Sequence, residues 1–174
     1  MDYGKSSSSS SHGKVIIMIL FLAMDMGLNS ILDYDVLNDQ RPDNILLGVF
    51  GLQVVIQISI FLILFLATAD TYLFRVGLLG VLVRTLRFVL LLHPLYMALT
   101  IATGAYRVRK LSGTDTLSTI WVDDVFITLS FLQKCVAIPY YIFNIRITIK
   151  LEDPIYYNKQ AWINLIQQQK SSYE

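Results

Sequence analysis

The chain has 174 residues, of which 55% are hydrophobic and only 16% are charged. Soluble domains carry about 25% charged residues, so this composition indicates a membrane protein with a single domain. The net charge of +1 argues against a nucleic-acid-binding protein, which needs a basic excess to neutralise phosphates. The single cysteine, Cys135, excludes an internal disulfide framework and is expected to be a small buried hydrophobe.

Four apolar stretches approach the length of about 20 residues that a helix needs to cross a bilayer. They predict spans at 15–32, 45–69, 88–105 and 125–145, within a transmembrane domain at 15–150. A flexible Ser-rich tail is expected at 1–14, and a tail with a short amphipathic helix at 151–174. The first stretch is interpreted as a retained helix, because no small-x-small cleavage site follows it. The predicted fold class is all-α, an integral membrane four-helix bundle with amphipathic interfacial segments.

One interfacial segment is expected between the second and third spans. Gly77, Gly80, Arg84 and Arg87 fall on one face of an otherwise apolar stretch that begins at Arg75. This pattern is typical of a helix that lies flat on the membrane surface. The alternative is that the stretch is an extended start of the third span.

The distribution of Lys and Arg predicts the orientation, because cytosolic loops are enriched in these residues. With four spans, both termini share one side, and nine Lys and Arg residues lie there against four on the other. Both termini are therefore expected in the cytosol. The basic cluster at 107–110 is the main observation against this orientation.

Two charges inside the spans carry the most information about the interior. A charged side chain at the bilayer centre costs at least about 2.5 kcal/mol on insertion scales. Asp25 and Lys134 have opposite signs and lie near the centres of the first and last spans, so pairing would offset part of this cost. We expect a direct Asp25–Lys134 contact that acts as a structural clamp; the alternative is an ion or proton path. The stripes expected to face the interior are Met18, Leu22, Asp25 and Asn29, and Ser130, Lys134, Ala137 and Tyr141.

Other polar and small residues inside the spans indicate helix packing rather than catalysis. Gln53 and Gln57 lie four residues apart, as in interhelical hydrogen bonding, and Thr100 and Gly104 have a spacing that permits close helix approach. His93 precedes Pro94, which indicates a helix kink rather than a ligand site. No nucleophile elbow, zinc-protease motif, phosphate loop or dinucleotide fingerprint is present. Catalytic, cofactor-binding and metal-binding residues are therefore not expected.

The segment after the fourth span is the best candidate for contact with partners or with the membrane surface. Asp153-Pro154 marks a turn or a helix start. Aromatic residues follow that resemble an interfacial anchor. The residues proposed for this interaction segment are Asp153, Pro154, Tyr156, Tyr157 and Trp162.

Scattered motifs in matching order resemble the transmembrane protein 138 family from about residue 20 to 165. They are Met24-Asp25 with Asn29-Ser30, Thr71-Tyr72-Leu73-Phe74 with Gly77-Leu78, Ile120-Trp121-Val122-Asp123, Phe131-Leu132-Gln133-Lys134, and Leu151-Glu152-Asp153-Pro154-Ile155-Tyr156-Tyr157 with Trp162. The Ser-rich start of the chain and the 107–119 loop differ from the family.

The resemblance implies a small, non-enzymatic, four-span protein that is required for cilium assembly. It implies residence at the transition zone of the ciliary base, or on vesicles and vacuole-like membranes that deliver ciliary cargo. The partners implied are membrane lipids, related tetraspan proteins and Tectonic-type transition-zone proteins. A first-helix acid and a last-helix base match Asp25 and Lys134. The rival interpretation from the residues alone is a small transporter or channel subunit that uses Asp25 and Lys134 in a polar path.

Overall fold

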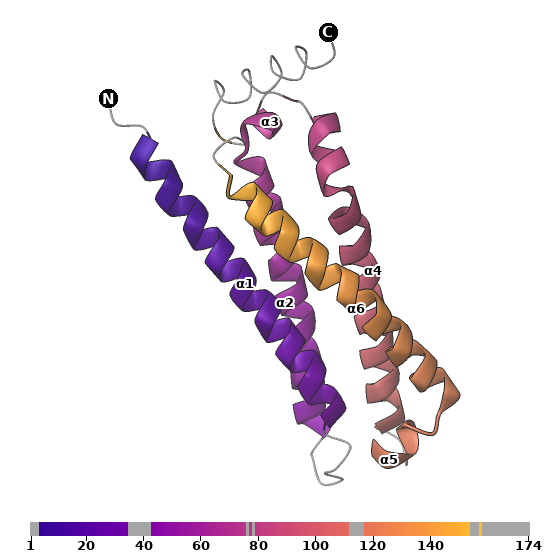
Figure 1. Cartoon of the computed structure of the whole chain (residues 1–174). Coiled ribbons are helices and arrows are strands. Elements are labelled where there is room, and N and C mark those ends of the chain that lie inside the picture. The colour runs from indigo at the N-terminus through magenta and orange to yellow at the C-terminus, as the bar shows by residue number, and fades with distance from the viewer. Residues whose placement is uncertain are drawn as a thin grey trace.

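The computed structural model describes residues 4–34, 43–75, 77, 79–111, 117–153 and 157. Within these ranges the chain forms helices and no strands (Figure 1). In chain order they are α1 (Gly4–Tyr34), α2 (Asp43–Ala69), α3 (Tyr72–Arg75), α4 (Leu79–Leu111), α5 (Leu117–Ile120) and α6 (Asp124–Leu151).

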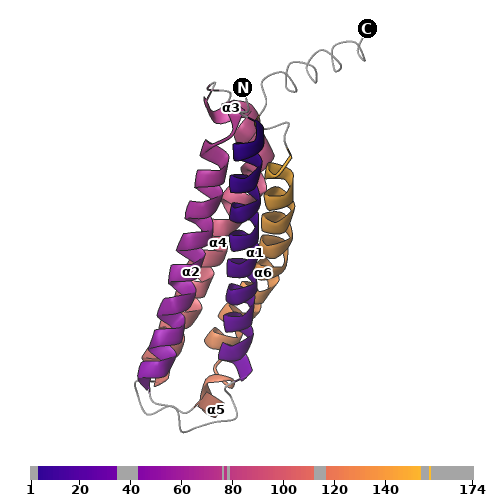
Figure 2. The same ribbon diagram turned by 90° about the vertical axis from the view of Figure 1, so that its left-hand side faces the viewer.

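Four of the helices are long and apolar enough to cross a membrane. Their candidate spans are Gly13–Ser30, Leu47–Ala69, Leu86–Leu111 and Asp124–Leu151. The predicted all-α fold with four long apolar helices is therefore confirmed. The beginning of α1 and the end of α6 lie at the same end of the bundle as α3, and α5 lies at the other end (Figures 1 and 2).

Two helix boundaries differ from the expectations. Helix α1 begins at Gly4, so it includes the Ser-rich segment that the sequence analysis assigned to a flexible tail. Helix formation is cooperative and no proline intervenes, so the helix of the apolar span can continue into this segment. Helix α4 begins at Leu79 and runs without a break into the third span, which is the alternative interpretation of the 75–87 segment. Gly77 makes the preceding turn with a φ of 78°, a conformation that glycine adopts without strain.

The helices pack as two pairs, α1 with α2 and α4 with α6, and α2 joins the pairs through α4. Apolar side chains such as Leu91, Phe131 and Ile138 point outward and are more than half exposed. Cys135 is exposed as well, so the expectation that it is buried was wrong. It belongs to the outward face of α6, where the surrounding lipid takes the place of a protein core.

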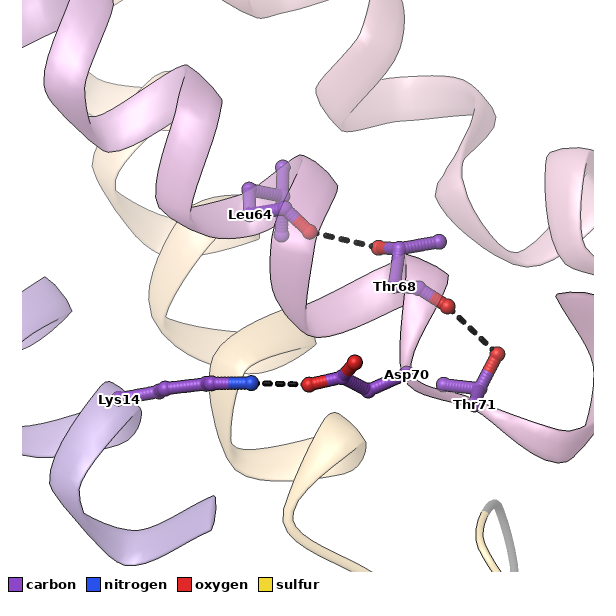
Figure 3. Close-up of polar contacts among 5 residues, drawn as sticks. All are labelled: Lys14, Leu64, Thr68, Asp70 and Thr71. Carbon is purple, nitrogen blue, oxygen red and sulfur yellow. Dashed lines mark hydrogen bonds and ion pairs between the residues drawn. The ribbon is translucent and has the colours of Figure 1, made fainter. Parts of the chain in front are cut away.

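Side chains at the end that holds α3 tie α1 to α2 (Figure 3). The Lys14 ammonium forms an ion pair with the Asp70 carboxylate, which directly follows the last residue of α2. The Thr68 hydroxyl donates to the carbonyl of Leu64 at 2.8 Å, and the Thr71 hydroxyl donates to the carbonyl of Thr68 at 2.7 Å. At the end of α2 the Thr68 carbonyl therefore accepts from both the hydroxyl and the backbone amide of Thr71.

Candidate functional site

A network of polar side chains crosses the middle of the bundle, and Asp25 is its centre. This aspartate of α1 is completely buried. One carboxylate oxygen accepts a hydrogen bond from the Gln57 amide of α2 at 3.1 Å. The other accepts from the Tyr141 hydroxyl of α6 at 2.6 Å. Asp25 therefore links three helices through hydrogen-bond donors that carry no charge.

Helix α4 completes the network. The hydroxyls of Tyr96 and Tyr141 are 3.1 Å apart. The Thr100 hydroxyl accepts from the Gln57 amide at 3.2 Å and from the Gln133 amide of α6 at 3.1 Å. Tyr96 is 0% exposed and Thr100 is 2% exposed. A single connected set of hydrogen bonds thus includes side chains from all four long helices.

Lys134 takes part in the network through Asn29 of α1. Its ammonium donates to the side-chain oxygen of Asn29 at 2.9 Å and to the backbone carbonyl of the same residue at 3.2 Å. Asn29 also accepts a hydrogen bond of 3.5 Å from Gln133. Asp25 and Lys134, the two charged residues predicted to face the interior, therefore both lie at the α1–α6 interface.

The expected direct contact between the two charges is not formed. Among the described residues, the structure has no ion pair between Asp25 and Lys134. The physical reason is the register of the antiparallel helices α1 and α6. Asp25 lies opposite Tyr141, whereas Lys134 lies opposite Asn29, which is roughly 6 Å further along α1. The two predicted residues are in one network but reach different partners.

His93 of α4 is 1% exposed and packs between aromatic rings. Its Nε2 lies 3.1 Å from the backbone carbonyl of Gln57. Its ring centroid is 5.1 Å from that of Phe61 and 5.2 Å from that of Tyr140. In the part of the chain that the structure describes, no group of three or more His, Cys, Asp and Glu residues could hold a metal ion. Its burial between these rings places His93 in the core of the bundle, and its contact with Gln57 places it beside the network.

A second polar cluster lies at the end of the bundle that holds α5, where the third candidate span ends and the fourth begins. Asp123 caps α6 by accepting from the backbone amides of Val125 at 2.9 Å and Phe126 at 3.4 Å. Its other oxygen accepts from the Tyr106 hydroxyl at 3.0 Å and forms an ion pair with Lys110 at 2.8 Å. The Lys110 ammonium, followed by these hydroxyl and amide donors, lowers the pKa of Asp123 from its ordinary value of 3.8 to about 2. We call Asp123, Tyr106 and Lys110 the Asp123 clasp, since they tie the end of α4 to the start of α6.

The predicted interaction segment is only partly within the described residues. Asp153 is exposed, and its amide donates to the carbonyl of Lys150 at 3.2 Å. Tyr157 is half-buried and lines an apolar pocket with residues of α1, α2 and α6. Pro154, Tyr156 and Trp162 lie outside the described residues.

Sequence reasoning missed the contribution of α4, although a signal for it is present. The polar residues His93, Tyr96, Thr100, Thr103 and Arg107 are three or four apart, which places them on one helical face. All five are buried. The expected α1 stripe, from Met18 to Asn29, is likewise buried, as are Ser130 and Ala137 of the α6 stripe. Chemically, the network can hold four helices in register, because it joins side chains of all four by interhelical hydrogen bonds.

The comparisons with known proteins agree on one family. A family model described as Transmembrane protein 138 matches residues 46–166. A Transmembrane protein 138 from Danio rerio is 32% identical over 102 residues, which are 59% of this chain and 62% of that protein. The chain thus spans less than two thirds of this relative's length.

Two further relatives cover more of the chain. Proteins named Transmembrane protein 138 from Xenopus tropicalis and from Mus musculus are each 26% identical over 147 residues, which are 84% of this chain and 87% of theirs. No solved structure matches the chain. Since the family model covers well over half of the sequence and the four long helices are apolar enough to span a bilayer, this chain is an integral membrane protein that belongs to the transmembrane protein 138 family.

Proposed function

We propose that this protein is a non-enzymatic membrane component required for cilium assembly. In this proposal it acts as a structural or trafficking element at the transition zone of the ciliary base, or on vesicles that deliver ciliary cargo. The observation that carries the proposal is family membership over residues 46–166, together with the motif residues that resemble the family.

The polar network supports action through contacts rather than turnover. Asp25 and Gln57 are fully buried, and the Asp25 carboxylate and the Gln57 amide nitrogen hydrogen-bond to side chains of other helices. Buried interhelical hydrogen bonds contribute modestly to the stability of membrane bundles, about 0.6 kcal/mol each. In this proposal Asp25 and Lys134 maintain bundle integrity, with Tyr141 and Asn29 as their respective partners on the facing helix.

The proposed partners are membrane lipids, related tetraspan proteins and Tectonic-type transition-zone proteins. The Lys and Arg distribution supports cytosolic termini, so the interaction segment would face the cytosol. Asp153 is exposed at the end of α6, which supports its access to a partner.

Proximity labelling in ciliated cells tests this function. We expect a tagged full-length chain to label transition-zone or vesicle proteins. A triple variant of the interaction segment, Tyr156→Ala, Tyr157→Ala and Trp162→Ala, should lose this labelling while the protein level stays the same. Val122→Ala is the matched control, because Val122 is 78% exposed at the other end of the bundle. Recovery of only metabolic or ion-transport partners would contradict the proposal.

A second function, a small transporter or channel subunit, is favoured by one specific observation. The Asp25 carboxylate, the Tyr141 hydroxyl and the Tyr96 hydroxyl form a chain of hydrogen bonds inside the bundle. Such a chain can relay a proton if both ends reach water. Flux measurements in vesicles that contain the purified chain distinguish the two functions. Transport that is lost in Asp25→Asn supports this second function, and equal leak with and without protein supports the structural one.

A further inference from the structure

A small polar cavity lies beside the network, towards the end of the bundle that holds α5. Its volume is about 20 Å³. All four long helices contribute to its wall. The lining residues are Asn29, Phe50, Gln53, Thr100, Thr103, Gly104, Arg107 and Gln133.

Two buried polar groups in this wall have no partner among the described residues. They are the amide nitrogen of Gln53 and the hydroxyl of Thr103. The two side chains are 1% and 4% exposed. A third wall residue, Thr100, accepts hydrogen bonds from Gln57 and Gln133 and retains its own hydroxyl proton for donation. An unpaired buried polar group is costly, and native structures usually satisfy such groups with protein or with ordered water.

We propose that this cavity is a binding site for an ordered water molecule, held by the Gln53 amide and the Thr103 hydroxyl. The size of the cavity supports this assignment, since a water molecule needs about 10–15 Å³ of accessible volume and two to four polar partners. The same volume is too small for a lipid headgroup. A dry cavity of this kind would be lined by apolar groups.

The water molecule would extend the hydrogen-bond network around Asp25. Thr100 and Gln133 line the cavity and also belong to the hydrogen-bonded set around Asp25. The bound water would therefore connect that set to Gln53 and Thr103, which lie on α2 and α4. The α2–α4 contact would then be partly water-mediated, in contrast to the direct side-chain contacts between α1 and α6.

Gly104 allows Phe50 to form one side of the cavity. The ring of Phe50 lies so close to Gly104 that an added Cβ would be 2.2 Å from its nearest carbon. Phe50 thus packs directly on the backbone of α4 and forms one side of the cavity. The Phe50 ring can also report the presence of the water molecule. An aromatic ring beside a bound water is readily oxidised when that water is converted to a hydroxyl radical.

Radical footprinting of the purified full chain in lipid nanodiscs tests the proposal. Brief X-ray exposure in heavy-oxygen water converts bound water to hydroxyl radicals, and mass spectrometry locates the label. We expect label on Phe50 several-fold above that on Phe65, which belongs to the same helix and is 54% exposed. Gln53→Leu and Thr103→Val should each reduce the label on Phe50 several-fold.

Thr68→Val is the matched control, because the Thr68 hydroxyl is buried but donates within its own helix. It should leave the Phe50 label unchanged. Equal labelling of Phe50 and Phe65, or Phe50 labelling that persists in both cavity variants, would overturn the proposal. A thermal stabilisation by chloride that disappears in Gln53→Leu would also overturn it, in favour of a small bound anion.

Discussion

Two aspartates of this protein, Asp25 and Asp123, are hydrogen-bonded in opposite ways. In the membrane interior, Asp25 accepts hydrogen bonds from an amide and a phenol, both uncharged. Outside the spans, Asp123 accepts from the Lys110 ammonium, a phenol and two backbone amides. Both carboxylates join α6 to other parts of the bundle, but only the outer one does so with a positive charge.

The difference follows from the cost of removing charge from water. A buried ion pair must repay the desolvation of two charges, and it often fails to do so. At the water-exposed end this cost is small, so Lys110 and the N-terminus of α6 can both hold Asp123 ionised. In the interior, neutral donors from two helices, α2 and α6, share one carboxylate. We therefore expect the interior network to determine helix register and the Asp123 clasp to respond to pH and salt.

The largest expected effect comes from crowding the interior at Gly104. Gly104→Val should destabilise the bundle by about 1–3 kcal/mol, because the new side chain would overlap the Phe50 ring. Reversible unfolding in mixed micelles measures this change. Gly51→Ala is the control, since a Cβ there meets nothing within 4 Å. Equal stability of Gly104→Val and the wild type would show that α2 and α4 do not pack closely at this point.

A smaller loss is expected from removal of the Asp25 carboxylate. Asp25→Leu should cost roughly 1 kcal/mol, the sum of two interhelical hydrogen bonds at about 0.6 kcal/mol each. Asp25→Asn, which keeps one acceptor oxygen, should cost less. A double-mutant cycle with Tyr141→Phe measures the coupling directly. Zero coupling would mean that the 2.6 Å contact does not stabilise the bundle.

The ion pair between Lys14 and Asp70 should contribute less than the interior hydrogen bonds. Lys14→Met is expected to destabilise the bundle by less than about 1 kcal/mol, because both side chains are partly exposed and salt screens them. Unfolding measured at low and high salt should show a difference from wild type that shrinks as salt rises. Lys150→Met, at an exposed lysine in the last turn of α6, is the matched control.

The smallest effect at neutral pH, and the most diagnostic for the Asp123 clasp, is a change in pH dependence. The folded pKa of Asp123 is lowered to about 2, so its contribution is fully present above the ordinary pKa of 3.8 and is lost as the pH falls through about 2. Asp123→Asn should remove this pH dependence from the free energy of unfolding measured between about pH 2 and pH 3.8. If the free energy of unfolding changed equally with pH in the wild type and in the variant, the assignment of the Asp123 clasp would be contradicted.

Much of the fold could be predicted from the sequence because hydropathy acts locally. Four apolar runs of sufficient length specify four helices wherever the chain meets lipid. Burial of Asp25 could be predicted as well, since a carboxylate in a span avoids lipid. The partner of Asp25 could not be predicted. A shift of two turns along α6 exchanges Lys134 for Tyr141, and no local pattern encodes that register.

The sequence by itself determined the environment, the number of long helices and the inward orientation of their polar residues, because each depends on the transfer of single side chains between lipid and protein. Only the tertiary structure decided which polar groups meet: Asp25 with Tyr141 and Gln57, Lys134 with Asn29, and Asp123 with Lys110. These contacts depend on helix register and crossing, which arise from packing along whole helices. The low charge content that first indicated a membrane protein therefore leaves few charges inside the spans, and the fold gives the buried carboxylate of Asp25 two neutral hydrogen-bond donors.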